Sequence, residues 1–415
     1  MTRGEFARRA AVLTVPAALG ASSFRIPLGV AATAPQSPFV LTASELAQVR
    51  RNIFDLKLPF TRRAWANTVA KADGWLGYEP SPTRSDADVS DWREAIYLPG
   101  LYDGVAAVTL ATAYAVGRRS EHGVRAKAIC LAWARTYRPA PPLHKIGHMV
   151  AEPVGPVIKL CMAYDLAKPV FTRAERAQFT SWAAQFVERG RINADYARDR
   201  PWVPDVTYGD DRANVAPYGN SATWQRAMAV FAAAVVGGST LRQTLEWNLQ
   251  HTTAGGLDYG WDNVLEGLVI DGSGGQLIEE RYRSSIEYGQ YSWVPLILIA
   301  NVARNVRFRV DLFEYRTKRH GYTIFSPFPY YAGFLTSSSI PDSLEKTVYG
   351  GAAWPTTTAR WRAVYEVLYR NASDPKLVKK LHNLVNYGGP RQRGDNYDIR
   401  IVGHAALFGR GPNGP

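Results

Sequence analysis

Apolar residues recur at intervals of three and four along most of the chain, and this helical period restricts the fold more than any other feature of the sequence. Two segments also carry start signals, because Thr42 and Ser44 precede ELAQVRRNIF and Thr172 precedes RAERAQFTSWAAQFV. Strand-like alternation is limited to short stretches near 322–335 and 398–408. The sequence therefore predicts a mainly α-helical fold with helices over 43–56, 60–76, 93–117, 121–137, 150–167, 171–190, 221–236, 239–251, 276–303, 356–371 and 374–386.

These helices follow one another without a strand-rich half and without a Pro/Gly linker, which indicates one domain over residues 35–415. We expect consecutive antiparallel pairs arranged as a single α/α toroid, an incomplete α/α barrel. Long loops rich in aromatic residues join some of the pairs, over 86–97, 198–220 and 252–263. Long ordered loops on a rigid scaffold commonly carry functional sites.

Residues 1–34 have the pattern of an export signal. Arg8 and Arg9 precede an apolar run over 10–21 that is interrupted by Pro16, and small residues continue to Ala34. The paired arginines and the weakly apolar run favour the Tat route, with an ordinary Sec signal as the alternative. We therefore expect a secreted or periplasmic protein. No later segment has 18 consecutive apolar residues, so the sequence predicts no membrane span.

The charge of the chain favours an anionic partner. Removal of the four arginines and the one glutamate of residues 1–34 lowers the formal net charge from +13 to +10. A basic surface of this size suits nucleic acid, an acidic polysaccharide or an anionic envelope. No run of five Lys or Arg residues and no aromatic-basic RNA-binding motif occurs, so an acidic polysaccharide is preferred to nucleic acid.

The cysteines and histidines give no support to a metal site. Cys130 and Cys161 both lie in apolar helical patterns, and they form either one disulfide or two separate buried thiols. The chain contains no CxxC, HxH or HExxH motif. We expect neither a metal nor another cofactor.

Two segments carry the residues best suited to chemistry. Gly219-Asn220-Ser221-Ala222-Thr223-Trp224 opens a predicted helix, and Asp271-Gly272-Ser273 precedes a stretch that contains Arg281 and Tyr288. In a helix, seven residues turn the chain by nearly two full turns. The side chains of Arg281 and Tyr288 would then lie within about 20° of each other and about 10 Å apart along the axis. A guanidinium and a phenol at that separation could hold the two ends of one acidic sugar ring.

At these residues the chain resembles the alginate lyase family, polysaccharide lyases with an (α/α) toroid fold. That family has a Gly-Asn-His-x-x-Trp-like segment at a helix start, then an Asp-Gly-Ser turn, an acidic stretch with arginine, and a tyrosine two turns later. Weaker similarity extends over 102–134 and 157–167. The resemblance implies β-elimination of a uronate polymer, with Asn220 neutralising the carboxylate, Arg281 supplying the guanidinium and Tyr288 acting as base and acid.

One position departs from the family pattern. The histidine that follows the asparagine in the family falls here on Ser221, and a hydroxyl cannot take a proton as an imidazole does. Either another histidine enters the site, for which His144 and His148 are the candidates, or the reaction relies on Tyr288 alone.

Elementary chemistry supports the same assignment of roles. The C5 proton of a uronate becomes acidic enough to remove only when the carboxylate is neutralised and the enolate is stabilised by aimed donors, which an Asn amide and an Arg fork provide without a metal. Where the C5 proton and O4 lie on the same side of the ring, one tyrosine can act as both base and acid. A neighbouring cation, Arg281 or Arg283, favours its phenolate. The predicted reaction is a metal-independent syn elimination on mannuronate-rich alginate or glucuronan.

Further side chains are candidates for contacting the substrate, and each has an ordinary structural alternative. Asn220 could be a helix N-cap, Trp224 could be core, Arg281 could form a surface ion pair, and Tyr288 could simply pack. Arg226, like the other arginines near these segments, is a candidate carboxylate ligand. The predicted substrate-binding residues are Ser221, Trp224, Arg283, Arg212, Tyr218, Trp202 and Trp261.

Two other functions stay open at this point. An inverting glycoside hydrolase on the same toroid needs two carboxyl groups about 6.5–9.5 Å apart, for which Asp210-Asp211 and Glu279-Glu280 are available. A non-catalytic polysaccharide-binding protein is favoured by the serine at 221. In all three cases the expected partner is an anionic polysaccharide, and a monomer is expected.

Overall fold

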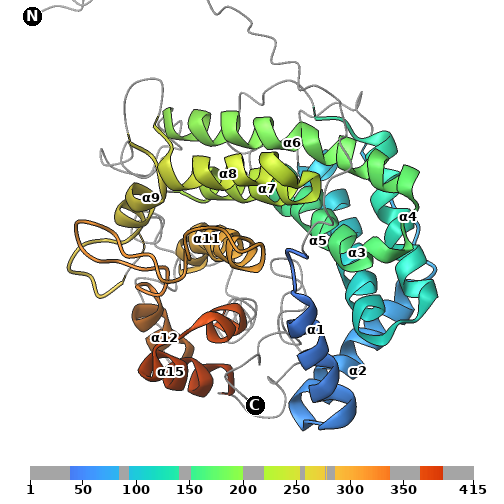
Figure 1. The fold of residues 1–415 in the computed structure, drawn as a ribbon, viewed down its shortest axis with the longest axis horizontal. Coiled ribbons are helices and arrows are strands. Elements are labelled where there is room, and N and C mark those ends of the chain that lie inside the picture. Colours follow the sequence, from blue (N-terminus) through green and yellow to red (C-terminus); the bar gives the residue numbers. More distant parts are fainter. Residues whose placement is uncertain are drawn as a thin grey trace, which may run out of the picture. The chain divides into compact units, whose positions relative to one another are not determined.

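The computed structural model describes residues 38–83, 93–139, 151–199, 219–252, 258–275, 277, 286–336 and 365–386. All of them belong to one compact unit, Pro35–Pro415. The predicted export signal, residues 1–34, lies outside the described residues. The described part is helical, with two isolated β-bridges and no named strand, so the predicted all-α fold is confirmed (Figure 1).

Most predicted helices are present close to their expected bounds. The first half of the chain contains α1 (Ala43–Arg50) with the π-helical turn η1 (Arg51–Asp55), α2 (Pro59–Gly74), η2 (Arg93–Tyr97) leading into α3 (Leu98–Gly117), α4 (Ser120–Thr136), η4 (Pro153–Val157) leading into α5 (Ile158–Ala167), η5 (Lys168–Val170) and α6 (Arg173–Asp199). The second half contains α7 (Asn220–Val236), α8 (Gly238–Gln250), α9 (Trp261–Leu268), α11 (Ile286–Asn305), α12 (Phe328–Thr336), a helix over 365–371 and α15 (Pro375–Asn386).

The two predicted start signals form reciprocal caps. The Thr42 N–H donates to Glu45 Oε2 (2.7 Å) and the Glu45 N–H donates to Thr42 Oγ1 (3.2 Å). The same pair of hydrogen bonds joins Thr172 and Glu175 at the start of α6 (2.7 and 3.2 Å). Each arrangement satisfies two N–H groups at the helix end, and this is why the sequence marks these starts clearly.

The helices form an inner and an outer series. The inner helices α3, α5, α7 and α11 pack successively against one another, the outer helices α2, α4 and α6 pack on them from outside (Figure 1), and α8 packs against α7. The inner helices are buried along almost their whole length, whereas the outer helices bury one face. This is the incomplete α/α toroid that the sequence predicts.

Neighbouring inner helices run in the same direction. Gly100 of α3 lies against Pro156, and one turn later a Cβ atom at Gly104 would lie only 2.9 Å from the Cβ of Lys159, so the two backbones approach closely at matching levels. Between α7 and α11, the Trp224 ring contacts the Tyr291 ring near both starts. The amino-terminal ends of adjacent inner helices therefore lie at the same end of the series.

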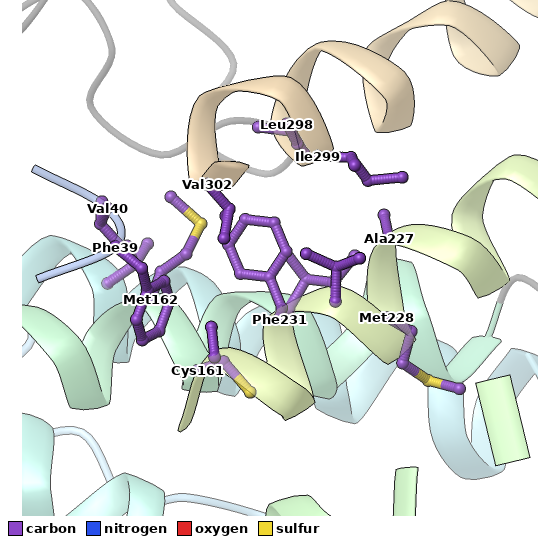
Figure 2. Close-up of a cluster of buried hydrophobic side chains, with 14 of the residues drawn as sticks. Phe39, Val40, Cys161, Met162, Ala227, Met228, Phe231, Leu298, Ile299 and Val302 are labelled. Atoms are coloured by element: carbon purple, nitrogen blue, oxygen red, sulfur yellow. The ribbon is translucent and has the colours of Figure 1, made fainter. Parts of the chain in front are cut away.

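Helices α7 and α11 also stay in contact in the second half of α7. Phe231 lies beside Leu298 and Val302 of α11 (Figure 2). Its ring also meets that of Phe39 edge to face, at 5.9 Å between centroids. The N–H groups of Phe39 and Val40 both donate to Asp165 Oδ2 near the end of α5 (3.0 and 2.9 Å). The segment that follows the predicted signal is thus fixed between α5, α7 and α11.

Both cysteines are free and fully buried, which excludes the disulfide alternative. The Cys130 thiol donates to the Leu160 carbonyl at 3.8 Å. Among the described helices, one stretch, Glu94–Gly117, is long and apolar enough to cross a membrane, and 72% of its apolar window is buried inside the fold.

Three sequence expectations differ from the structure. The strand-like stretch near 322–335 is wrong, because Phe328 and Tyr331 instead bury one face of α12. Of the helix predicted over 276–303, the described part is α11 (Ile286–Asn305), and Leu277 instead forms an antiparallel bridge with Val269. Helix α9 is not predicted by the sequence. The stretch 398–408 lies outside the described residues.

Candidate active site

Asn220 is the first residue of α7, and its side chain does not cap the helix. The N-cap is Gly219, in an extended conformation (φ −70°, ψ 170°), and no side chain of the described residues caps this helix start. The Asn220 side chain is buried, with 7% of its surface exposed. The first N–H groups of α7 therefore add to the partial positive charge of the helix end beside a buried amide. This arrangement suits a carboxylate, and it removes the N-cap explanation for Asn220.

Ser221 contacts this amide. Its hydroxyl donates to Asn220 Oδ1 over 3.4 Å, and the side chain is half-buried. A hydroxyl can help to orient the amide, but it supplies no base. Position 221 therefore offers no second base to a substrate.

The starts of α7 and α11 lie side by side. The rings of Trp224 and Tyr291 are 5.4 Å apart between centroids, at an angle of 54°. Asn220 precedes Trp224 by about one turn, and residue 288 precedes Tyr291 by about one turn in the first turn of α11. The fold therefore joins the two segments that the sequence analysis connected. The side chain of Tyr288 lies outside the described part.

Two predicted substrate-contacting residues are core residues in this structure. Trp224 exposes 1% of its surface and Trp261, the first residue of α9, exposes none. Neither ring has an accessible face, so a stacking platform for a sugar is not available there. Both indole N–H groups are buried and find no hydrogen-bond partner among the described residues. Trp224 and Trp261 therefore contribute to core packing.

Arg226 is also structural, which corrects its interpretation as a carboxylate ligand. It is fully buried between the rings of Trp247 and Tyr259, at 4.9 and 4.3 Å from the ring centroids. One of its terminal nitrogens donates to Asn248 Oδ1 (3.3 Å), and the other donates to the Tyr259 carbonyl. The guanidinium joins α7 to α8 and to the segment before α9.

The turn that leads toward residue 281 is firmly held. Asp271 accepts a hydrogen bond from the Tyr322 hydroxyl (3.1 Å) and lies 3.5 Å from His320 Nε2. Burial and the Asp271 carboxylate raise the pKa of Tyr322, so the phenol stays protonated and donates. Gly275 has φ +114°, and a Cβ atom there would meet the Ser326 carbonyl oxygen at 2.5 Å, so this turn requires glycine.

Sequence reasoning missed this attachment because it depends on the acidic face of the unpredicted α9. His320 Nδ1 lies 2.5 Å from Glu266 Oε2, and Asp262 accepts hydrogen bonds from the Tyr315 hydroxyl (3.0 Å) and the Lys318 N–H (2.9 Å). The signal available in the sequence is the pattern of Asp262 and Glu266, one turn apart on a short amphipathic stretch.

A second buried network lies at Glu152, immediately before η4. Glu152 is fully buried and accepts hydrogen bonds from Tyr137 Oη (2.5 Å) and Arg189 Nε (2.5 Å). Burial, and then the Glu152 carboxylate, raise the pKa of Tyr137 well above its ordinary value. This network fixes the entry to η4 and α5, and sequence reasoning did not identify it.

The other predicted site residues share one topological property. They occur in segments that lead directly into the inner helices α5, α7 and α11, and all of them lie outside the described residues. These residues are His144, His148, Trp202, Arg212, Tyr218, Arg281 and Arg283. Because the inner helices run parallel, the starts of α5, α7 and α11 lie at one end of the toroid.

Residues 102–328 match the protein family described as alginate lyase, which is more than half of the chain. This chain belongs to the alginate lyase family. It is accordingly a polysaccharide lyase. The family match includes α7, α11 and the Asp271–Gly275 turn, and ends at the first residue of α12.

Two solved structures show the same fold. An alginate lyase from Bacteroides ovatus superimposes with a TM-score of 0.60 at 12% identity, over 88% of this chain and 98% of that chain. A tyrosine-to-phenylalanine variant of alginate lyase A1-III, complexed with a tetrasaccharide, superimposes with a TM-score of 0.50 at 14% identity, over 85% of this chain and 95% of that chain. No curated protein sequence matches this alginate lyase family member significantly.

Proposed function

We propose that this lyase cleaves a 4-O-linked uronate polymer, mannuronate-rich alginate or glucuronan, by metal-independent syn β-elimination. The observation that carries the proposal is the juxtaposition of Asn220, buried and not used as a cap, with the first turn of α11, where residue 288 lies. The family membership and the tetrasaccharide in the A1-III structure support a polysaccharide substrate. Export by the amino-terminal segment, which would give access to such a polymer outside the cytoplasm, belongs to the proposal.

In the proposed mechanism the sugar carboxylate is neutralised first. The Asn220 amide, the Arg281 guanidinium and the N–H groups at the start of α7 act together on its charge. The same donors stabilise the enolate that forms when the C5 proton leaves. Stabilisation of developing charge by fixed donors commonly lowers the barrier of such reactions more than any other single effect.

Tyr288 then moves one proton between two atoms of the substrate. Its phenolate takes the C5 proton, the electron pair forms the C4–C5 double bond, and the C4–O4 bond breaks. The same phenol returns its proton to the departing O4. The products are an unsaturated uronate at one new chain end and a free hydroxyl at the other, and Tyr288 ends as the phenolate with which it began.

Ser221 determines which substrates suit this mechanism. With a hydroxyl where the family has histidine, no second base is supplied at that position for the opposite face of the ring. Mannuronate and glucuronate place the C5 proton and O4 on the same side, where Tyr288 suffices. His144 or His148 could supply an imidazole instead, in which case polyguluronate would also be cleaved.

The proposed roles are tested by Tyr288→Phe, with Tyr102→Phe as the matched control. Tyr102 lies on α3, is 55% exposed and has no role in the proposed mechanism. We expect Tyr288→Phe to lower kcat on polymannuronate or glucuronan by about 10²–10⁴-fold while polymer binding persists, because only the proton transfer is removed. Turnover by Tyr288→Phe equal to that of the control would contradict the assignment.

A further inference from the structure

A groove lies between the segment 313–329 and the beginning of α15. Its volume is about 340 Å³, which is at the small end of the range for ligand sites. The lining residues from 329 onward, which include Lys376, Leu377 and Lys380 of α15, fall outside the residues that match the alginate lyase family. The groove contains none of the residues assigned to the proposed active site.

Three cations of this groove are open to a ligand. Arg316, Lys376 and Lys380 are all exposed, and no carboxylate or hydrogen-bond acceptor engages any of their side chains in the described part of the chain. An Arg fork beside two flexible ammonium groups can hold successive carboxylates along a chain. The positive charge of these groups is therefore available to an anionic polymer.

The two acids of the groove are already engaged within the protein. Glu314 accepts a hydrogen bond from the Ser373 hydroxyl (2.7 Å) and lies 3.8 Å from Arg304. Asp374 accepts a hydrogen bond from the Lys376 N–H (2.9 Å), as a residue that caps the start of α15. In the described part of the chain, neither acid forms an ion pair with Arg316, Lys376 or Lys380, and the groove keeps an excess of positive charge.

Apolar side chains form part of the remaining wall, together with the hydroxyl groups of Thr323, Ser326 and Ser373. Phe325 and Leu377 are half-buried and Pro329 is exposed, so these three offer apolar surface to a ligand, whereas Phe313 and Phe328 are buried and offer almost none. The rings of Phe313 and Phe325 are 5.9 Å apart between centroids. An aliphatic sugar face can lie on such a wall while its carboxylates reach the cations, and this combination is the reason for preferring a charged sugar to a free inorganic anion.

We propose that this groove is a second binding site for the uronate polymer, which holds a part of the chain that is not being cleaved. The inference rests on the proposed function for the identity of the ligand. The charge complementarity between a row of carboxylates and the three cations favours fast capture and retention of the polymer. An anionic lipid surface is the competing occupant that the experiment must exclude.

The test is affinity electrophoresis in the cold through gels that contain sodium polymannuronate, compared with a neutral polysaccharide. The groove variant is R316Q/K376Q/K380Q. The matched control is R51Q/R62Q/K71Q, which removes the same charge from exposed residues around α1 and α2 that make no ion pair with any described residue. Each exposed ion pair between a groove cation and a polymer carboxylate is weak, but three of them act together. We therefore expect the groove variant to bind polymannuronate about tenfold more weakly than the wild type. The control should bind like the wild type.

The possible outcomes separate the two proposals. Equal retention of the groove variant and the control would overturn the second site, since only general charge would then matter. Loss of binding to phosphatidylglycerol vesicles, with no change in polymannuronate binding, would assign the groove to a membrane and also overturn it. Groove-dependent polymer binding by a wild-type chain that releases no unsaturated product would instead contradict the proposed function and leave the second site standing.

Discussion

At the scale of single residues, the position of Asn220 matters most for the proposed chemistry. An asparagine at a predicted helix start is ordinarily an N-cap, and the sequence alone leaves that explanation open. In the structure the cap is Gly219, so the amide is not needed to begin α7. A buried amide with no capping role at the positive end of a helix is well placed to neutralise an anionic substrate.

Replacing Asn220 separates catalysis from stability. We expect Asn220→Ala to lower kcat by about 10²–10³-fold, the usual effect of removing one aimed donor from a developing negative charge. The free energy of unfolding should fall by about 1–3 kcal/mol, because the buried amide has partners that include the Ser221 hydroxyl, although no helix cap is lost. Asn263→Ala, a half-buried asparagine of α9, is the control. Activity assays paired with urea unfolding measure both effects, and a large loss of stability with normal kcat would give Asn220 a structural role only.

Arg226 is expected to behave in the opposite way. Arg226→Met leaves Asn248 Oδ1 and the Tyr259 carbonyl without their buried donor, at a cost of about 2–4 kcal/mol in the free energy of unfolding. The exposed Arg62→Met should stay within about 0.5 kcal/mol of the wild type. Urea denaturation at one pH compares the two. An Arg226→Met chain as stable as the control would show that the guanidinium does not join α7 to α8.

At the scale of elements, the helices could be predicted because period and caps agree. Thr42 and Thr172 head capping boxes at the starts of α1 and α6, and local chemistry of this kind is readable from sequence. Helix α12 could not be predicted, because FPYYAGFLT has strand-like composition and only its packing decides. Tyr331 is buried against Trp293 at 6.0 Å between ring centroids, a contact between residues distant in sequence.

The anchoring of the segment Phe39–Leu41 to α5 gives a prediction about pH. Burial raises the pKa of Asp165 from its ordinary 3.8 to about 6, against the opposing effect of the Val40 and Phe39 N–H groups. The fold therefore holds this proton more tightly than the unfolded chain does. The stability from this group is fully present below pH 3.8 and is lost as the pH rises through about 6.

Two substitutions at Asp165 distinguish charge from hydrogen bonding. Asp165→Asn keeps an acceptor without a charge, so the difference in unfolding free energy between it and the wild type should grow in favour of the variant as the pH rises from 4 to 7. Asp165→Ala also lacks the charge but leaves two N–H groups without an acceptor, so it should be about 2 kcal/mol less stable than Asp165→Asn at every pH. Thermal and urea unfolding across this range test both. A wild-type chain and Asp165→Asn with parallel pH profiles would show that the carboxyl does not titrate in the window.

At the scale of the whole molecule, the toroid explains why residues far apart in sequence share a site. Parallel inner helices bring the starts of α7 and α11 together, although Asn220 and residue 288 belong to helices separated by α8 and α9. The sequence could indicate the residue types by their resemblance to a family, but not this neighbourhood, which depends on the order of packing. Arg226 and Trp261 show the converse, because their chemistry suits a site and the fold buries them.

The central claim is that this chain breaks a uronate polymer by elimination. The most direct measurement is the ultraviolet absorbance of the purified protein mixed in turn with polymannuronate, polyguluronate, glucuronan, hyaluronan and pectate, together with an assay for new reducing ends. We expect rising absorbance with polymannuronate or glucuronan, since only elimination makes an unsaturated uronate. New reducing ends without absorbance would mean hydrolysis, and silence in both assays with all five polymers would contradict the claim.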